Sequence, residues 1–451
     1  MNRTLPLILT AALLLTACAS AVPAQPADAT TSPDAAASSP AQPDAAASSP
    51  SQPATETSAP PLTPKFPVGH LLTLPQNQNS GPVWNTGDAL YELRDASNMT
   101  PEALVLKTDY AALTQSVYCD IPGCTHDSDA CPAYLASDFC VGVMAVDGTV
   151  YTYPGELTNV APTQIYRIDP AAGKTPVAAV PDALPHHMQL QWCDEYALYG
   201  CPLAASHQPG TLYRWDWRND TVQTIPMLAD EKIIACEGSR FLTIRIEANE
   251  PFPNFGSTEQ EKAILAHAVY VYAWLDPATG AREKICTRPY ADGYFHNYYD
   301  GRIYYTGNFR NADTPGQQAA LLYFDTADGT EKTLLDGIPL DTYVIDVCVP
   351  FSPAFAGVPQ RYLRVLNVGD AYADCLLDME TGDVLPAPAV TAEGVRRPAL
   401  LLACTASGQW LTTANPRDSY DPQYSLYALW DPADFLADGQ PAAWVTMYAT
   451  E

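Results

Sequence analysis

Four short phrases decide the fold: Asp169-Pro-Ala-Ala-Gly173, Asp276-Pro-Ala-Thr-Gly280, Asp325-Thr-Ala-Asp-Gly329 and Asp378-Met-Glu-Thr-Gly382. Each phrase follows a short apolar stretch and precedes another short strand pattern. An aspartate accepts hydrogen bonds from its own backbone two residues later, and a glycine supplies a positive φ. Each phrase therefore predicts a tight turn between two antiparallel strands.

The same kind of apolar stretch also ends at Asp109, Asp216 and Asp431, so seven aspartates recur at intervals of 60, 47, 60, 49, 53 and 53 residues. Between them lie further strand pairs, at 143–151, 190–198, 233–246, 294–305 and 401–412. About four short strands in about fifty residues are typical of a propeller blade. We therefore predict an all-β fold with a single β-propeller of seven blades, each of four short antiparallel strands. Six or eight blades, or tandem β-sandwiches, are the alternatives. We also expect residues 70–75 to close the ring with the last blade.

The N-terminus has the pattern of an export signal. Met1-Asn2-Arg3 carries one positive charge, residues 5–15 are apolar apart from Pro6 and Thr10, and Leu15-Thr16-Ala17 precede Cys18. The apolar run is shorter than the roughly 20 residues that a spanning helix needs. A cysteine directly after Leu-Thr-Ala resembles the lipobox of bacterial lipoproteins. The resemblance implies that residues 1–17 are removed and that Cys18 carries the lipid; an ordinary signal peptide with an incidental cysteine is the alternative.

Residues 18–64 have the composition of a spacer. They consist almost entirely of Ala, Pro, Ser, Thr, Asp and Gln, and the decapeptide 33–42 is repeated at 43–52 with one change. Such a segment buries too little apolar surface to offset the entropy of ordering. About 46 disordered residues would reach on the order of 40 Å. The sequence thus predicts a lipidated Cys18, a disordered linker to residue 64, and a propeller over residues 65–451.

The net charge of the chain disfavours nucleic acid and anionic lipid as partners. The chain has a formal net charge of −28. Only −3 of this lies in residues 1–64, where one arginine stands against four acidic residues, so −25 remains on the predicted propeller. A domain this acidic repels nucleic acid and anionic lipid. We therefore expect no nucleic-acid partner, and membrane contact only through the lipid anchor, on the extracytoplasmic face of the cell membrane or on the cell surface of a Gram-positive-type envelope.

A cysteine and histidine cluster interrupts the repeats at about residues 117–140. It consists of Cys119, Cys124, His126 and Cys131 in the pattern C-x4-C-x-H-x4-C. Three thiols and one imidazole form the ligand set of a closed, structural zinc site. The alternatives are disulfides, with Cys131 paired to Cys140 and Cys119 to Cys124, or free thiols. Each of these readings assigns the segment a structural role.

The Asp-turn-Gly repeats resemble those of propeller families found in bacterial envelope lipoproteins. Within that group, the phrase from Tyr118 to Leu135, Tyr-Cys-Asp-Ile-Pro-Gly-Cys-Thr-His-Asp-Ser-Asp-Ala-Cys-Pro-Ala-Tyr-Leu, resembles a segment of uncharacterised lipoproteins of gut clostridia. The repeats cover most of residues 83–445, whereas the distinctive phrase is short. The resemblance implies a fold and a cellular location, but no reaction.

Several of the remaining cysteines stand at similar places in their repeats. Cys193, Cys236 and Cys404, and less clearly Cys140 and Cys348, end apolar strands just before turns. We interpret them as small buried residues, with disulfides as the alternative. Removing Cys18 leaves an odd number, eleven, so at least one cysteine has no disulfide partner. The pairs that local spacing would most readily allow are Cys193 with Cys201 and Cys348 with Cys375.

Other chemistry is sparse. We find no phosphate-binding loop, nucleophile elbow or His-Glu-x-x-His helix in the sequence. His186 and His187 follow a proline, where a solvated turn is a simpler interpretation than a metal site. The aromatic residues of 294–305, with Trp215 and Trp217, either offer stacking faces to a sugar or pack between sheets. We therefore expect a non-enzymatic propeller that binds an unknown protein or carbohydrate, with an extracytoplasmic enzyme acting on glycans or peptides as the alternative.

Overall fold

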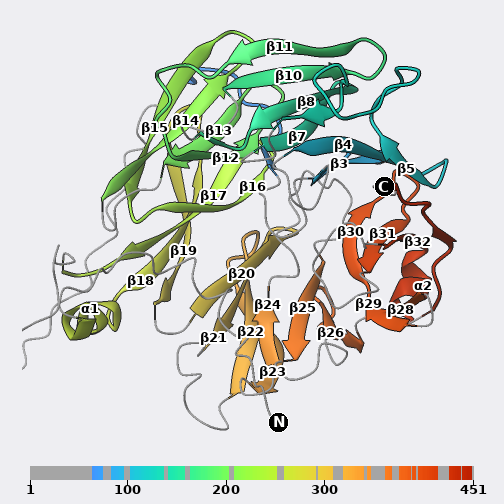
Figure 1. Ribbon diagram of the computed structural model, residues 1–451. Helices are drawn as coiled ribbons and strands as arrows, with labels where there is room; N and C mark the ends of the chain where they lie inside the picture. The colour runs from blue at the N-terminus through green and yellow to red at the C-terminus, as the bar shows by residue number, and fades with distance from the viewer. Residues whose placement is uncertain are drawn as a thin grey trace, which may run out of the picture. The chain divides into compact units, whose positions relative to one another are not determined.

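The computed structural model describes residues 63–74, 83–95, 102–136, 141–157, 163–202, 208–250, 258–290, 293–307, 318–339, 343–346, 361–367, 375–386, 389–392, 395–414, 426–437 and 439–448. Contacts divide the chain into residues 1–60 and residues 61–451, and the described residues all belong to the second unit. This unit is a seven-bladed β-propeller, as the repeats predict (Figure 1).

Four antiparallel strands, joined in chain order, build each blade. Blade 1 consists of β2 (Val83–Asn85), β3 (Ala89–Asp95), β4 (Ala103–Asp109) and β5 (Thr114–Val117). Blade 2 consists of β7 (Val141–Val146), β8 (Thr149–Pro154), β10 (Gln164–Asp169) and β11 (Gly173–Ala179). Blade 3 consists of β12 (Met188–Cys193), β13 (Leu198–Pro202), β14 (Pro209–Asp216) and β15 (Thr221–Ala229).

The next four blades repeat this order. Blade 4 consists of β16 (Lys232–Glu237), β17 (Arg240–Glu247), β18 (Val269–Leu275) and β19 (Arg282–Pro289). Blade 5 consists of β20 (Gly293–Tyr299), β21 (Arg302–Gly307), β22 (Gln318–Asp325) and β23 (Glu331–Pro339). Blade 6 consists of β24 (Tyr343–Asp346), β25 (Tyr362–Asn367), β26 (Cys375–Asp378) and β27 (Val384–Pro386). Blade 7 consists of β30 (Leu400–Cys404), β31 (Trp410–Ala414), β32 (Leu426–Trp430) and β33 (Ala443–Trp444).

A few short elements lie outside this scheme. β1 (Leu72–Thr73), β6 (Tyr134–Leu135) and β9 (Glu156–Leu157) pair with blade strands, and β28 (Ala389–Ala392) with β29 (Val395–Pro398) forms a hairpin between blades 6 and 7. The two helices described are α1 (Thr258–Leu265) and α2 (Pro432–Leu436). No helix within the described ranges has the length and apolar character needed to cross a bilayer.

The seven repeated aspartates stand at the end of the third strand of their blades, or one residue after it. Asp169 and Asp276 illustrate the predicted turn: each carboxylate accepts hydrogen bonds from the backbone N–H groups two and three residues later, at 2.8–3.3 Å. The glycines that end the four phrases all have positive φ values, between 69° and 121°. In blade 7 Asp431 instead precedes α2, so that turn is replaced by a short helix.

Apolar side chains join every blade to its neighbours. The six apolar clusters found among the described residues each combine at least two blades: the largest joins blades 1, 2 and 3, and the others join 3 with 4, 4 with 5, 5 with 6, 6 with 7, and 7 with 1. Sheets packed face to face in this way remove apolar surface from water, at roughly 25 cal/mol per Å². The core therefore lies between the blades and runs round the whole ring.

The ring is closed by the C-terminal segment. Backbone groups of Thr446 bond those of Leu113 and Gln115 at 2.8 Å in a parallel bridge. The expectation that residues 70–75 meet the last blade is wrong: Leu72 and Thr73 in β1 pair with Cys193 and Trp192 of β12, in blade 3. Residues 65–74 form a strap there because Leu71 packs among the apolar side chains that join blades 3 and 4.

Candidate metal centre

The cysteine and histidine cluster lies in the connection between blades 1 and 2, described to residue 136. The chain leaves β5, turns through residues 118–133, and returns as β6 to pair with the start of β4. Gly123 and His126 both have left-handed backbones, with φ values of 73° and 59°. These two positions bend the chain back on itself, so that a segment of thirteen residues brings its four ligand side chains together.

The four predicted ligands converge. One ligand atom from each of Cys119, Cys124, His126 and Cys131 lies within 4.8 Å of all the others. The Nδ1 atom of His126 is 3.3 Å from the Sγ atom of Cys131, so this ring nitrogen faces the thiols. Cys131 is buried, and the other three side chains are partly buried. The sequence prediction that these four residues act together is therefore matched by their geometry.

Residues of blade 2 form hydrogen bonds and an ion pair with the segment that carries the cluster. The backbone N–H of Asp120 donates a 2.7 Å hydrogen bond to the carbonyl of Pro170, in the turn between β10 and β11. Lys174 of β11 forms a 2.8 Å ion pair with Asp129 and donates a hydrogen bond to the carbonyl of Tyr134. The insertion thus joins the outer strand of blade 1 to the Asp-turn-Gly phrase of blade 2.

The thiols differ in their electrostatic surroundings. Burial raises the pKa of Cys119 and raises that of Cys131 to about 12. A hydrogen bond from the backbone N–H of His126 lowers the pKa of Cys124. A thiol must lose its proton to bind a metal ion, so metal binding at this cluster is coupled to proton release.

The donor set fits a metal ion. Thiolates bound at about 2.3 Å to a tetrahedral zinc lie roughly 3.8 Å apart, which is compatible with the spacing of these four atoms. All three thiols are free in the structure. The alternative pairing of Cys131 with Cys140 involves a residue outside the described ranges. The cluster can therefore hold a metal ion, and four protein ligands would complete its coordination.

Three of the other described cysteines have the burial that the sequence predicts. Cys193 and Cys404 are buried and Cys236 is partly buried, and each lies at or near the end of the first strand of its blade. The suggested pair of Cys193 with Cys201 is wrong because the register of the β12–β13 hairpin places Cys193 opposite Leu198, at the other end from Cys201. Cys348 lies outside the described residues.

The aromatic candidates support the packing interpretation. Trp215 is 0% exposed and Trp217 is 8% exposed, and Tyr298, Tyr304 and Tyr305 are also buried. His186 and His187 are exposed and lie in the turn region before β12, where His187 has a φ of 61°. Neither histidine belongs to the metal cluster. Cys18, the predicted lipidation site, lies outside the described residues, so its lipidation stays a prediction.

Comparisons with known proteins show a similarity of fold and nothing more. No protein-family model matches the chain, and no curated protein matches it. Among solved structures, the chain is similar to a crystallised ACO/RPE65 chimera, at 13% identity and a TM-score of 0.36, over 85% of this chain and 90% of that one. Oligogalacturonate lyase in complex with manganese matches at 10% identity and a TM-score of 0.36, over 75% and 81% of the two chains. A prolyl endopeptidase matches at 11% identity and a TM-score of 0.42, over 84% of this chain and 48% of that one. At these scores no activity is transferred to this chain.

Proposed function

We propose that this protein is a lipid-anchored, extracytoplasmic binding module, in which a β-propeller with a structural zinc ion presents a surface to a ligand or protein partner. Cys18 would carry the lipid and residues 19–64 would act as a spacer. The propeller would bind without catalysing a reaction.

One observation carries the non-enzymatic part of this proposal: the carboxylates buried among the described residues are all engaged within the protein. A general acid or base must exchange a proton with its substrate. The buried carboxylates instead accept hydrogen bonds from protein groups, Glu92 from Arg94 and Tyr427, Asp194 from Tyr199, Asp216 from Asn219, and Asp378 from Arg361. Their geometry supports a structural role in holding strands and blades together.

The position of the metal cluster supports a structural role for zinc. Its ligands come from one connection whose surroundings are tied to two blades, through Asp120 and Lys174. Zinc bound there would hold the connection in its folded shape, because a structural zinc site contributes its binding free energy to folding.

Membrane fractionation of the full chain tests the anchor. We expect the wild-type protein in the membrane fraction, extractable only with detergent, and the Cys18→Ser variant in the soluble fraction. Mass spectrometry of the mature N-terminus should show a diacylglycerol-modified Cys18. An unmodified cysteine, or equal partition of the two proteins, would overturn the anchor.

Elemental analysis of the purified protein tests the zinc. We expect about one equivalent in the wild type and in Cys286→Ser, whose thiol lies outside the cluster, and a loss of most of it in Cys131→Ser. Less than about a tenth of an equivalent, together with intact disulfides by mass spectrometry, would remove zinc from the proposal.

Capture experiments from native membranes test the binding role. The anchored protein should retain a defined partner in near-stoichiometric amount. Turnover of glycans or peptides by the purified protein, without such a partner, would replace the binding module with the enzyme alternative.

A further inference from the structure

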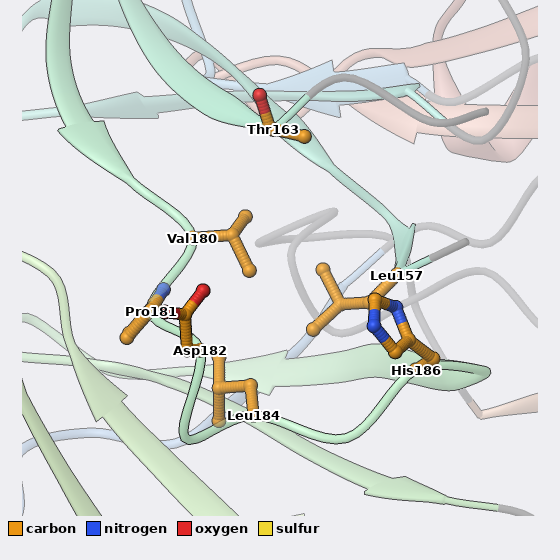
Figure 2. A pocket seen from close by; sticks show the side chains of 7 residues that line it. All are labelled: Leu157, Thr163, Val180, Pro181, Asp182, Leu184 and His186. Atoms are coloured by element: carbon orange, nitrogen blue, oxygen red, sulfur yellow. The ribbon is translucent and has the colours of Figure 1, made fainter. Parts of the chain in front are cut away.

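A groove outside the metal centre lies where blade 2 passes into blade 3. Leu157 and Thr163 come from the connection between β8 and β10, and Val180, Leu184 and His186 come from the connection between β11 and β12. Pro181 and Asp182 complete its lining. Figure 2 shows these side chains around an open space, with Pro181 and Asp182 on one side and Leu157 and His186 on the other.

The groove opens on the face of the propeller opposite to the Asp-turn-Gly phrases. In an antiparallel blade the first and third connections share one face, and the second connection and the link to the next blade share the other. Strand β12 confirms this arrangement: Met188 at its start pairs with Leu157 of the groove, and Cys193 at its end pairs with Leu72 of the strap. The backbone of Lys65 is bonded to Ala278, in the turn between β18 and β19. Lys65 and the groove therefore lie on opposite faces of the propeller.

The lining combines an apolar wall with a polar rim. Leu157 and Leu184 are each 5% exposed, and Val180 and Pro181 add partly buried apolar surface. Thr163, Asp182 and His186 are exposed. The volume is about 360 Å³, near the lower end of the roughly 300–1,000 Å³ typical of ligand sites. The groove thus has room for one or two side chains, with the apolar wall as the main contact.

The charge and the chemical character of the lining residues indicate which kind of ligand the groove would bind. Asp182 places a carboxylate at the rim, and the whole chain carries a net charge of −28, so an anionic group is repelled. A sugar would need several directed hydrogen-bonding groups and an aromatic stacking face, whereas four of the seven lining residues are aliphatic or proline. A ligand with a cation next to an apolar group would pair with the Asp182 carboxylate at the rim and contact the apolar wall.

We propose that this groove binds a basic peptide segment of a partner protein, with one apolar side chain inserted between Leu157, Val180 and Leu184 and a neighbouring lysine or arginine beside Asp182. This inference rests on the proposed binding function and assigns its site and its class of partner. The groove lies on the face of the propeller opposite to residue 65, near which the described chain begins.

Fluorescence anisotropy with short synthetic peptides tests the groove on the full-length protein. The probe is a Lys-Leu-Lys unit in glycine and serine flanks, and the control peptides replace it with Glu-Leu-Glu or Lys-Ser-Lys. We expect the probe to bind about tenfold more tightly than either control, since each loses one of the two contacts. Equal binding of the probe and the Glu-Leu-Glu peptide, or no binding of the probe, would overturn the proposal.

Three variants locate the binding. Asp182→Lys should weaken the probe about tenfold by reversing the rim charge, and Thr163→Trp should weaken it similarly by filling the groove. Glu261→Lys, on the exposed surface of α1, changes the net charge by the same amount and should stay within about twofold of the wild type. Circular dichroism spectra that match the wild type confirm that the variants are folded. Equal weakening by Asp182→Lys and Glu261→Lys would show that overall charge alone attracts the peptide, and would overturn the groove.

The same variant separates this inference from the proposed function. If Asp182→Lys retains the native membrane partner as well as the wild type does, the groove assignment fails and the binding module stands. If the wild type retains no partner, the binding function itself fails and the groove assignment with it.

Discussion

A buried carboxylate of blade 1 accepts a hydrogen bond from blade 7 where the ring closes, and we expect its removal to destabilise the whole propeller. Glu92 is 3% exposed and lies on β3 of blade 1. Its Oε1 atom accepts hydrogen bonds from Arg94 at 2.7 Å and Gln115 at 3.1 Å, and its Oε2 atom accepts one from Tyr427 of blade 7 at 2.6 Å. Burial raises the pKa of Tyr427 well above its usual value, so this hydroxyl stays a donor.

The Glu92→Ala substitution leaves the Arg94 guanidinium, itself 6% exposed, buried without its carboxylate. Breaking a buried ion pair by removing one partner costs about 3–5 kcal/mol, because the remaining charge is uncompensated. We expect the free energy of unfolding, measured by urea titration with tryptophan fluorescence, to fall by about this amount. Tyr427→Phe removes one hydrogen bond to a charged group and should cost about 1.5–3 kcal/mol.

The matched control is an exposed ion pair. Lys262 and Glu259 on α1 lie 3.2 Å apart with both side chains largely in water, so Glu259→Ala should change the free energy by less than about 0.5 kcal/mol. A double-mutant cycle of Glu92→Ala with Tyr427→Phe should show coupling, because both residues belong to one network. A loss below about 1 kcal/mol for Glu92→Ala, or additive effects in the cycle, would refute this account of ring closure.

Three further predictions follow from local geometry. Burial raises the pKa of Asp378, but the ion pair and hydrogen bonds with Arg361 outweigh this effect, so the net shift of the pKa is downward. The stability that this carboxylate adds is present above its unfolded pKa of about 3.9 and is lost as the pH falls through its lower folded pKa. Urea unfolding between pH 5 and pH 2 should therefore show a weaker acid dependence in Asp378→Asn than in the wild type. Gly382→Ala should lower the free energy of unfolding, measured by urea titration, clearly more than Gly280→Ala, which should lower it by about 1–2 kcal/mol. Both glycines have φ values of 75–79°, but a Cβ at Gly382 would meet a backbone oxygen of β23 at 2.8 Å, whereas a Cβ at Gly280 would meet no atom within 4 Å. Equal losses in the two variants would contradict this reasoning. Chelator treatment should lower the thermal midpoint of the wild type and leave that of Cys131→Ser unchanged in differential scanning fluorimetry; a wild type indifferent to chelator would contradict a structural ion.

Local chemistry made the repeats predictable from the sequence. The Asp-turn-Gly phrases specify a turn within five residues, since the aspartate accepts from its own backbone and the glycine adopts a positive φ, as at Asp169 and Gly173. Seven aspartates at near-constant spacing, four of them in such phrases, predict seven blades. The ligands of the metal cluster were predictable for the same reason, because Cys119 and Cys131 are separated by a short segment that one bent connection can close.

Contacts between distant segments were decided only by the tertiary structure. Leu72 pairs with Cys193 rather than with the last blade, and Thr446 closes the ring beside Leu113. The register of one hairpin separates Cys193 from Cys201, although only seven residues lie between them along the chain. Each blade offers similar apolar strands, so the sequence pattern alone does not distinguish one docking position from another. Which position a segment takes depends on side-chain packing between whole sheets, and that packing exists only once the blades are assembled.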